Sequence, residues 1–386
     1  MKQLYEDYSA QKKIIDSFKE PLSDFDRTDY NYICNKLIYG KNKKIVLYEI
    51  CSLFAIPVFI IIYTINRIFI VKDKQQKTIL IESTNRKGQK YNFDGRLPDF
   101  DNSYQPIKIM KMGTFPKFKE GVIGKKAFLI FLKYSIRHPF NFFNNFRCLV
   151  NIMGYNKLLV KFSPKAIVNS RMELNHMANL ITLLCEENKC EFINLMHGEV
   201  LYNVATSFVR FSKFYIWDEH YIDVFSWGRC PVDQFEVYQP EIFNLSLNKE
   251  TRPEYYITYI FLGDEKAGCD KNAPAVREIL KKFVKQGKKC KIRPHPRWSD
   301  IEQLKQIFAD TEITIEDPRK VNVAESLTNT EMVVGTFSTV MSEAFYSHKK
   351  IVLDDVSDKD VYQSLFERGY ILINKPHELL SCLISK

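Results

Sequence analysis

Short apolar runs alternate with amphipathic helical patterns along most of this 386-residue chain. Residues 166–169 and 191–196 have the composition of buried strands, and the apolar residues of 172–187 between them recur at helical spacing. The same alternation resumes after Pro253 with a strand at 255–262, a helix at 273–285 and a strand at 290–293, and it continues to a last strand at 351–353. A strand, a helix and a second strand in succession form a unit with parallel strands. The sequence therefore predicts an α/β protein built from doubly wound parallel sheets.

The length of the chain exceeds what one small core accommodates, so we expect two such sheets in series. The first begins with a strand at 78–82, and the polar, aperiodic segment 238–252 reads as the linker. The predicted division is an N-terminal helical region at 1–77, a first Rossmann-like domain at 78–245 and a second at 246–386. Because parallel sheets bind ligands at the carboxyl ends of their strands, we expect the two domains to face a common cleft.

Composition restricts the classes of partner. A net charge of +10 favours an anionic partner, and a hydrophobic content of 45% excludes a disordered or low-complexity protein. The nine cysteines are odd in number and contain no Cys-x-x-Cys pair, which disfavours a zinc site and a secreted disulfide framework and favours a reducing cytosol. The acidic residues lack metal-ligand spacing, so we predict that no metal and no cofactor are required.

One segment is long and apolar enough to enter a membrane. Residues 50–65 carry no charge and are flanked by lysines and arginines on both sides. As a helix they extend about 24 Å, short of the ~30 Å hydrocarbon core, and Pro57 would kink the helix. We predict a membrane-associating segment at 45–71, with insertion from one side, a true span and a buried soluble helix as the alternatives. No signal peptide is expected at the N-terminus.

A basic and aromatic stretch follows at 102–165. It contains twelve lysines or arginines, twelve aromatic residues and a single acid, Glu120. A solvated basic face over core aromatics and a surface for anionic phospholipid or a pyrophosphate-linked acceptor are the two main interpretations. We expect no nucleic-acid partner, because no helix-turn-helix, RNP-like or OB signature accompanies the stretch.

The strongest candidate for phosphate chemistry is Arg293-Pro294-His295-Pro296-Arg297, which directly follows a strand. Guanidinium groups bind phosphate oxygens, and a histidine at the end of a strand can donate a hydrogen bond or a proton to a departing nucleotide. We therefore place Arg293, His295, Pro296 and Arg297 in a donor-phosphate site. A second His-Pro pair, His138-Pro139, is interpreted as structural.

A second candidate lies where a buried strand runs through glycine into a helix. Backbone N–H groups at such a helix start favour a phosphate, although Ser338 and Thr339 could instead only cap the helix. Glu343, one turn further, is placed to meet a ribose or sugar hydroxyl. The predicted nucleotide-binding residues here and in the turn after strand 255–262 are Gly263, Asp264, Gly335, Thr336, Ser338, Thr339 and Glu343.

The first domain has its own candidate base. His197 ends a strand and precedes Gly198, which permits a sharp exit of the chain. With an unperturbed pKa near ~6.5, an imidazole can act as a general base near neutrality. Asp218 and Glu219 end the next strand and are predicted acceptor-binding residues, with a solvated loop as the alternative.

These motifs resemble a family. His-Gly after a strand, Arg-Pro-His-Pro at 293–296, and Gly-Thr-x-Ser-Thr-x-x-x-Glu-Ala at 335–344 followed by Lys-Ile-Val-Leu-Asp-Asp are similar to motifs of the GT-B glycosyltransferases of bacterial surface polysaccharides. The nearest groups are the sialyltransferases and polysialyltransferases, and the teichoic-acid glycerol-phosphate transferases. Both groups use CMP or CDP donors.

The resemblance implies roles residue by residue. His295-Pro296 and Ser338-Thr339 match the donor-phosphate motifs of the sialyltransferases, but Met196-His197-Gly198 stands where their acidic motif supplies the base. The glycerol-phosphate transferases look similar at His-Gly and at Arg-Pro-His-Pro. By this resemblance His197 is the base and His295 a donor-phosphate ligand.

The resemblance and the residues together predict a metal-independent, inverting GT-B glycosyltransferase. Its partners would be a nucleotide-sugar donor, a glycan or lipid-linked acceptor and the anionic surface of the bacterial inner membrane, on the cytoplasmic face. Three alternatives remain open: a CDP-glycerol type polyol-phosphate transferase, a nucleotide-sugar 2-epimerase, and a non-catalytic membrane scaffold of a polysaccharide assembly complex.

Overall fold

The computed structural model describes residues 7–39, 45–73, 78–84, 97–98, 100, 104–105, 107–113, 121–243, 253–262 and 271–385. Contacts divide the chain into two compact units. The first comprises residues 1–197 and 202–239, and the second comprises residues 198–201 and 240–386. The N-terminal helices therefore belong to the first unit, and a short piece of the chain centre belongs to the second.

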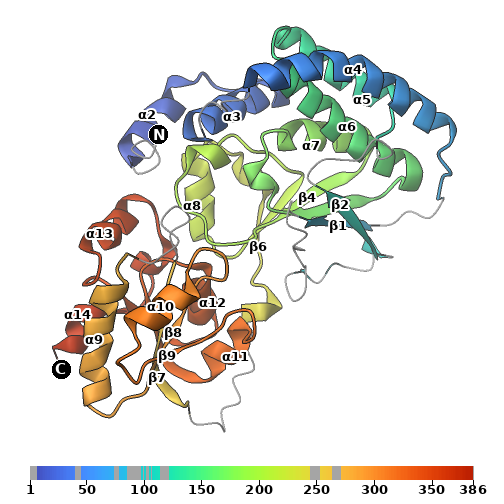
Figure 1. Ribbon diagram of the computed structural model, residues 1–386. Coiled ribbons are helices and arrows are strands. Elements are labelled where there is room, and N and C mark those ends of the chain that lie inside the picture. The colour runs from blue at the N-terminus through green and yellow to red at the C-terminus, as the bar shows by residue number, and fades with distance from the viewer. Residues whose placement is uncertain are drawn as a thin grey trace. The chain divides into compact units, whose positions relative to one another are not determined.

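The first unit contains a fully parallel six-stranded sheet (Figure 1). Its strand order is β2-β1-β3-β4-β5-β6. β2 is added on one side of β1, and β3 to β6 follow on the other side, so the switch point of this sheet lies between β1 and β3. The strands are β1 (Thr78–Thr84), β2 (Ile107–Gly113), β3 (Ala166–Ser170), β4 (Glu191–Leu195), β5 (Lys213–Ile216) and β6 (Phe235–Val237). The flanking helices are α5 (Lys125–Arg137), α6 (Phe142–Phe162), α7 (Ala178–Glu187) and α8 (His220–Trp227).

The second unit contains another parallel six-stranded sheet, of order β12-β11-β10-β7-β8-β9. This is the order of a dinucleotide-binding Rossmann sheet, and its switch point lies between β7 and β10. The strands are β7 (Tyr255–Ile260), β8 (Cys290–Arg293), β9 (Thr314–Ile315), β10 (Thr330–Gly335), β11 (Lys350–Leu353) and β12 (Glu378–Leu379). The helices are α9 (Ala273–Lys285), α10 (Ile301–Ile307), α11 (Val323–Thr328), α12 (Thr339–Tyr346), α13 (Lys359–Glu367) and α14 (Leu380–Ile384).

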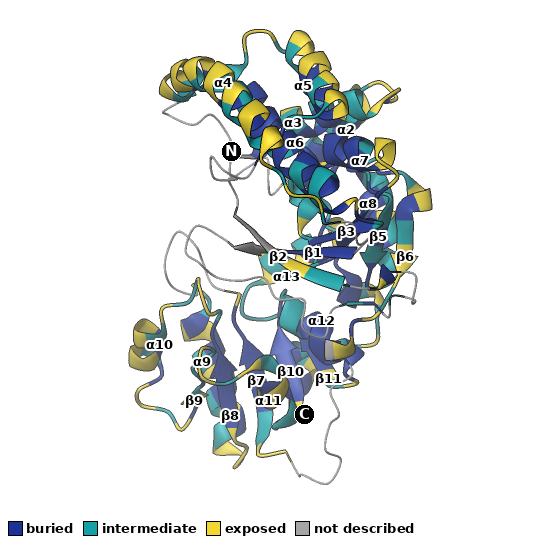
Figure 2. Ribbon diagram, turned by 90° about the vertical axis from the view of Figure 1, so that its right-hand side faces the viewer, coloured by how far each residue is buried: buried dark blue, intermediate teal, exposed yellow. Residues whose placement is uncertain are grey.

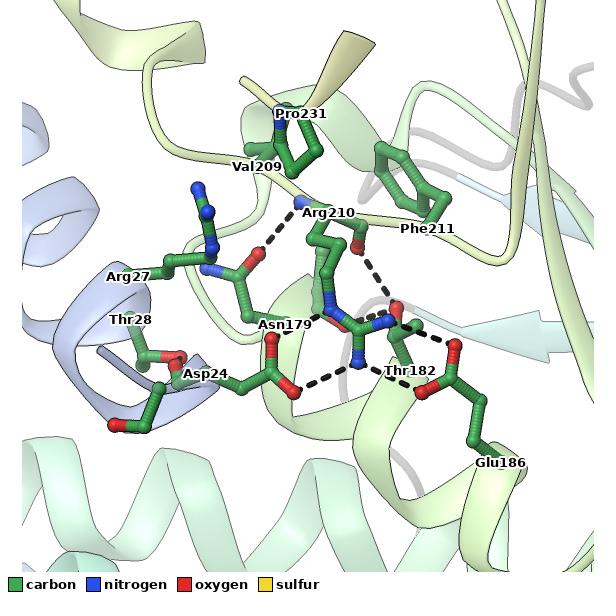
Figure 3. A network of polar contacts seen from close by, with 12 residues as sticks. Asp24, Arg27, Thr28, Asn179, Thr182, Glu186, Val209, Arg210, Phe211 and Pro231 are labelled. Carbon is green, nitrogen blue, oxygen red and sulfur yellow. Dashed lines mark hydrogen bonds and ion pairs between the residues drawn. The ribbon is translucent and has the colours of Figure 1, made fainter. Parts of the chain in front are cut away.

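Two N-terminal helices, α2 (Tyr8–Ser17) and α3 (Asp24–Tyr39), are fixed on the first unit by apolar packing and by an ionic network. Arg210, which precedes β5, donates to the carboxylates of Asp24 on α3 and Glu186 on α7, with Nε 2.6 Å from Asp24 Oδ1 (Figure 3). Both carboxylates raise the pKa of Arg210 despite its burial. This guanidinium thus joins α3 to α7.

The helix α4 (Ile45–Ile68) continues through Pro57 and packs along α6. Its inner face contacts the first unit over most of its length. Tyr48 stacks on Phe143, Phe59 meets Phe146 edge to face, and the Asn66 amide donates to Gly121 O at 3.0 Å. Its outer face is apolar and exposed. Figure 2 shows exposed residues along both α4 and α5.

The predicted α/β class and its two Rossmann-like parallel sheets are confirmed. Most elements lie within two residues of their predicted bounds. The helix expected at 172–187 differs: it begins only at Ala178, because 172–174 forms a 3-10 turn, η2. β2 lies inside the basic stretch, where no strand was predicted, as an edge strand paired with β1.

Candidate functional site

The first unit holds a histidine–carboxylate pair. His197 Nδ1 lies 2.6 Å from Glu173 Oε1, and the other oxygen of Glu173 accepts the Asn194 amide at 2.8 Å. Glu173 is fully buried, whereas the His197 side chain keeps 25% of its exposure. Burial alone would raise the pKa of Glu173, but the His197 imidazole and the Asn194 amide lower it below its ordinary value. The carboxylate is therefore ionised and orients the imidazole.

Strand register explains why these two residues meet. β3 and β4 run parallel with Ser170 opposite Leu195, so both strands end at the same edge of the sheet. Glu173 follows Ser170 by three residues, and His197 follows Leu195 by two. The η2 turn (Met172–Leu174) is held in place by Met172 N, which donates to the Asn194 side chain at 3.0 Å. The turn brings the Glu173 carboxylate against Asn194 and His197.

The pairing sets the tautomer of His197. A carboxylate accepts a proton donated by Nδ1, which leaves Nε2 as the basic nitrogen of the neutral ring. A base of this kind removes the proton of a hydroxyl nucleophile, while the buried carboxylate stabilises the imidazolium that forms. The arrangement fits the predicted role of His197.

The residues after His197 belong to the second unit. Glu199 N donates to Thr339 Oγ1 at 3.2 Å, and the Ser342 hydroxyl donates to the Glu199 carboxylate. A Cβ at Gly198 would come within 3.2 Å of the same Thr339 oxygen. The candidate base is thus followed directly in the chain by a segment that is hydrogen-bonded to α12.

The switch point of the second sheet carries the predicted glycine motif. Gly335 ends β10, and a Cβ there would lie 3.1 Å from Ile260 O of β7, so glycine permits this close approach. Ser338 caps α12, accepting from Val340 N at 3.2 Å, which is the capping role considered as an alternative. Its hydroxyl proton, and that of Thr339, can still be donated to a ligand. Thr336 and Glu343 are both buried beside it.

His295 follows β8 on the same sheet, and its protonation state is defined by the local backbone. Its Nδ1 accepts the N–H groups of Arg297 at 3.1 Å and Trp298 at 3.2 Å, so the neutral ring carries its proton on Nε2. Burial, and secondarily the Arg297 guanidinium, lower the pKa of His295 to about 4. The ring also stacks on Trp298. His295 is therefore a neutral hydrogen-bond donor near pH 7.

Arg293 has a different position from the one expected of a phosphate ligand. Its guanidinium is buried and donates to Glu316, with Nη2 also donating to Val321 O at 3.1 Å. Lys291 Nζ lies 2.7 Å from the same carboxylate. Two buried cations thus share one buried carboxylate, and Arg293 supports the end of β8 from inside. Arg297 and Pro296, in contrast, are exposed.

Asp218 and Glu219 follow β5, whose Tyr215 lies opposite Leu195 of β4, so they are at the same sheet edge as His197. Asp218 Oδ1 accepts His220 N at 3.0 Å at the start of α8, and Glu219 is exposed. Gly263 and Asp264 lie outside the described residues. In the described part of the chain, no group of three or more His, Cys, Asp or Glu side chains could hold a metal ion.

Sequence reasoning missed Glu173 and its support, Asn194. A signal was present, because an acid three residues after one strand and a histidine two residues after the neighbouring strand must share a sheet edge. It was obscured because 172–187 was interpreted as one continuous helix.

Comparisons with known proteins give similarities of fold only. No protein-family model and no curated protein match this chain. Among solved structures, the wall teichoic acid polymerase TagF is 12% identical, with 95% of this chain and 88% of that chain covered and a TM-score of 0.44. The UDP-GlcNAc 2-epimerase of Methanocaldococcus jannaschii is 12% identical, covers 78% and 94%, and has a TM-score of 0.42. The UDP-GlcNAc 2-epimerase of Neisseria meningitidis is 10% identical, covers 78% and 92%, and has a TM-score of 0.44.

Proposed function

We propose that this protein is a transferase that moves a glycosyl group from a nucleotide-linked donor to a hydroxyl of a surface-polysaccharide or lipid-linked acceptor. The observation that carries the proposal is the His197–Glu173 pair, since an oriented imidazole against a buried carboxylate is an activator of hydroxyl groups. The first unit binds the acceptor in this proposal, and the second unit binds the donor.

The donor unit offers hydrogen-bond donors rather than a buried charge. The Nε2–H group of His295, the hydroxyls of Ser338 and Thr339 and the start of α12 would meet the phosphate oxygens. Arg297 would supply the positive charge in place of Arg293, whose guanidinium is bound by Glu316. Such fixed donors stabilise a departing nucleotide phosphate.

The proposed reaction is inverting transfer. His197 Nε2 takes the acceptor hydroxyl proton as the oxygen attacks the anomeric carbon, and the bond to the nucleotide phosphate breaks on the opposite side. Attack at phosphorus instead would make the protein a polyol-phosphate transferase. A thermal-shift panel of CMP-, CDP-, UDP- and GDP-linked donors identifies the donor on which either reaction depends, because a donor that binds only the folded state raises the melting temperature. Stabilisation by none of them contradicts the proposal.

We expect His295→Ala to weaken donor-nucleotide binding by about 1.5–3 kcal/mol, as for a hydrogen bond to a charged group. Because the pKa of His295 is about 4, this contribution stays constant between pH 8 and pH 6. Isothermal titration calorimetry of the wild type and of His295→Ala at each pH measures this contribution. The ratio of the two dissociation constants cancels the effect of other groups that change protonation in both proteins. A contribution that grows steeply near pH 6.5 would show a charged imidazole instead.

The same pKa has a consequence for stability. The unfolded chain takes up the His295 proton near the ordinary value of 6.5, and the folded protein only near 4. Acidification from 6.5 to 4 therefore favours the unfolded state at this residue, and above 6.5 the effect is absent. His295→Gln should become more stable relative to the wild type as pH falls through this window in urea unfolding.

We also propose that α4 docks the protein on the cytoplasmic face of the inner membrane. It is the one helix in the described residues that is long and apolar enough to cross a membrane, with 11% of its most apolar window buried. Because its inner face is bonded to the first unit from Tyr48 to Asn66, insertion from one side agrees with these contacts better than a span.

Replacing Phe54, Ile61 and Ile65 by serine should release the protein from lipid vesicles. These side chains are 68%, 60% and 47% exposed, so the fold loses little, whereas each forfeits roughly 1.5 kcal/mol or more of burial in lipid. Vesicle flotation at high salt measures the loss, because salt does not screen apolar burial. Serine at Val232, Leu262 and Phe366, also exposed, is the matched control. Equal release by both triple variants would contradict docking by α4.

A further inference from the structure

A cavity of about 940 Å³ lies in the first unit among α3, α4, α6 and the η2 turn. None of the residues in the proposed reaction lines it. Its polar and charged lining includes Lys36, Glu49, His138, Arg147, Arg171 and His176. Its size is that of pockets that hold small organic ligands.

The charge of this cavity is unbalanced. Lys36, Arg147 and Arg171 contribute three cations, and Glu49, which accepts Phe143 N at 2.8 Å, contributes the lining carboxylate. Within the part of the chain that the structure describes, Arg147 has no ion pair with a carboxylate. Burial lowers the pKa of Arg147, as expected of a guanidinium held away from water. The cavity is thus complementary to an anion.

Two histidines in the lining of the cavity are hydrogen-bonded to other side chains of the first unit. His176 is buried, with Nε2 3.0 Å from Asn144 Oδ1, and its pKa is lowered well below the ordinary value by burial and by Arg147. His138 Nε2 lies 2.6 Å from Asp29 Oδ1, so this ring is held in the structural role expected for it. Both histidines are therefore engaged by the protein itself, and the cations of the lining are the groups that would meet a ligand.

The rim of the cavity continues into the exposed apolar surface. Phe140, which lines the cavity, is 87% exposed, and Ile45 at the start of α4 lines it as well. Exposed apolar residues continue along α4 and at Leu129, Leu132 and Ile136 of α5. Figure 2 shows exposed residues along both helices. A ligand with an anionic head and an apolar tail matches a cationic cavity whose lining continues into an exposed apolar surface.

We propose that this cavity, called here the headgroup pocket, binds the phosphate headgroup of an anionic membrane lipid. Lys36, Arg147 and Arg171 hold the phosphate oxygens, and the acyl chains lie against Phe140 and the exposed side chains of α4. This inference rests on the proposed membrane docking and is independent of the transfer reaction. It makes the docking selective for anionic lipid.

The test compares Arg147→Gln with Lys133→Gln. Both variants remove one positive charge, but Lys133 is exposed on α5 and does not line the pocket. Binding is measured to vesicles of phosphatidylcholine and to vesicles in which part of it is replaced by phosphatidylglycerol. At raised salt, where exposed charges are screened, Arg147→Gln should lose about tenfold or more in affinity for the anionic vesicles. Lys133→Gln and Arg147→Lys should lose little, and affinity for the neutral vesicles should be unchanged.

Other outcomes overturn the proposal. Equal losses for Arg147→Gln and Lys133→Gln would show only diffuse attraction to the surface. Displacement of the wild-type protein from anionic vesicles by low concentrations of glycerol 3-phosphate would assign the pocket to a soluble phosphate. Equal binding of the wild type to both vesicle types would leave docking by α4 standing and contradict the headgroup pocket. Binding to neither vesicle type would contradict both proposals. Unchanged melting of Arg147→Gln verifies that the variant is folded.

Discussion

Glu173→Gln is expected to lower the turnover of the transfer reaction by about 10³- to 10⁴-fold, the scale seen when the carboxylate behind a catalytic histidine becomes an amide. Both oxygens of Glu173 accept hydrogen bonds, from His197 and from Asn194. An amide must turn a donor toward one of them, which favours the His197 tautomer with its proton on Nε2. His197 is then still present, but its Nε2 carries the proton and cannot act as the base. Initial rates with saturating donor measure the loss.

Three controls make this result specific. Donor-nucleotide affinity should be unchanged, because Glu173 and His197 belong to the first unit. Glu187→Gln, at an exposed carboxylate at the end of α7, should retain activity. Once His197→Ala has abolished transfer, adding Glu173→Gln should cost little more, since residues that act as a unit are not additive. Full additivity would mean that Glu173 does not act through His197.

Glu316→Ala should lower the free energy of unfolding of the second unit by about 3–5 kcal/mol, because removal of one member of a buried ion pair leaves the other uncompensated. The cost here involves two cations, since Lys291 and Arg293 both donate to Glu316 and are nearly inaccessible. Urea denaturation followed by Trp298 fluorescence, in a background with Trp217 and Trp227 replaced by phenylalanine, reports on this unit.

The effect has a defined pH dependence. Burial would raise the pKa of Glu316, but Lys291, Ser326 and Arg293 lower it below the ordinary 4.5. The stabilisation is therefore present above pH 4.5 and is lost as the pH falls through the lower pKa of the folded state. Glu312→Ala, at an exposed carboxylate nearby, should change the free energy by no more than about 0.5 kcal/mol. A similarly small effect of Glu316→Ala at neutral pH would refute the buried network.

The fold follows from local patterns that short segments express by themselves. Residues 273–285 form a helix and 290–293 a strand with the predicted bounds, because apolar spacing and strand composition are properties of adjacent residues. The glycine-containing turn after β10 and the histidines after β4 and β8 could likewise be placed from the sequence, because each follows a strong strand. Edge strands such as β2 were missed, because half-solvated edges lack a continuous apolar run.

The partner of each functional side chain was decided by tertiary structure. From sequence alone Arg293 and Arg297 are equivalent neighbours of His295, yet only the fold places Glu316 beside Arg293 and leaves Arg297 exposed. Glu173 becomes the partner of His197 through the register of β3 and β4, and Lys36, Arg147 and Arg171 meet through the packing of α3 on the first unit. Ion pairs and pockets depend on contacts between residues distant in the chain, which periodicity does not encode. The sequence by itself therefore determined the strands and their ends, and only packing decided which charges are paired and which line a pocket.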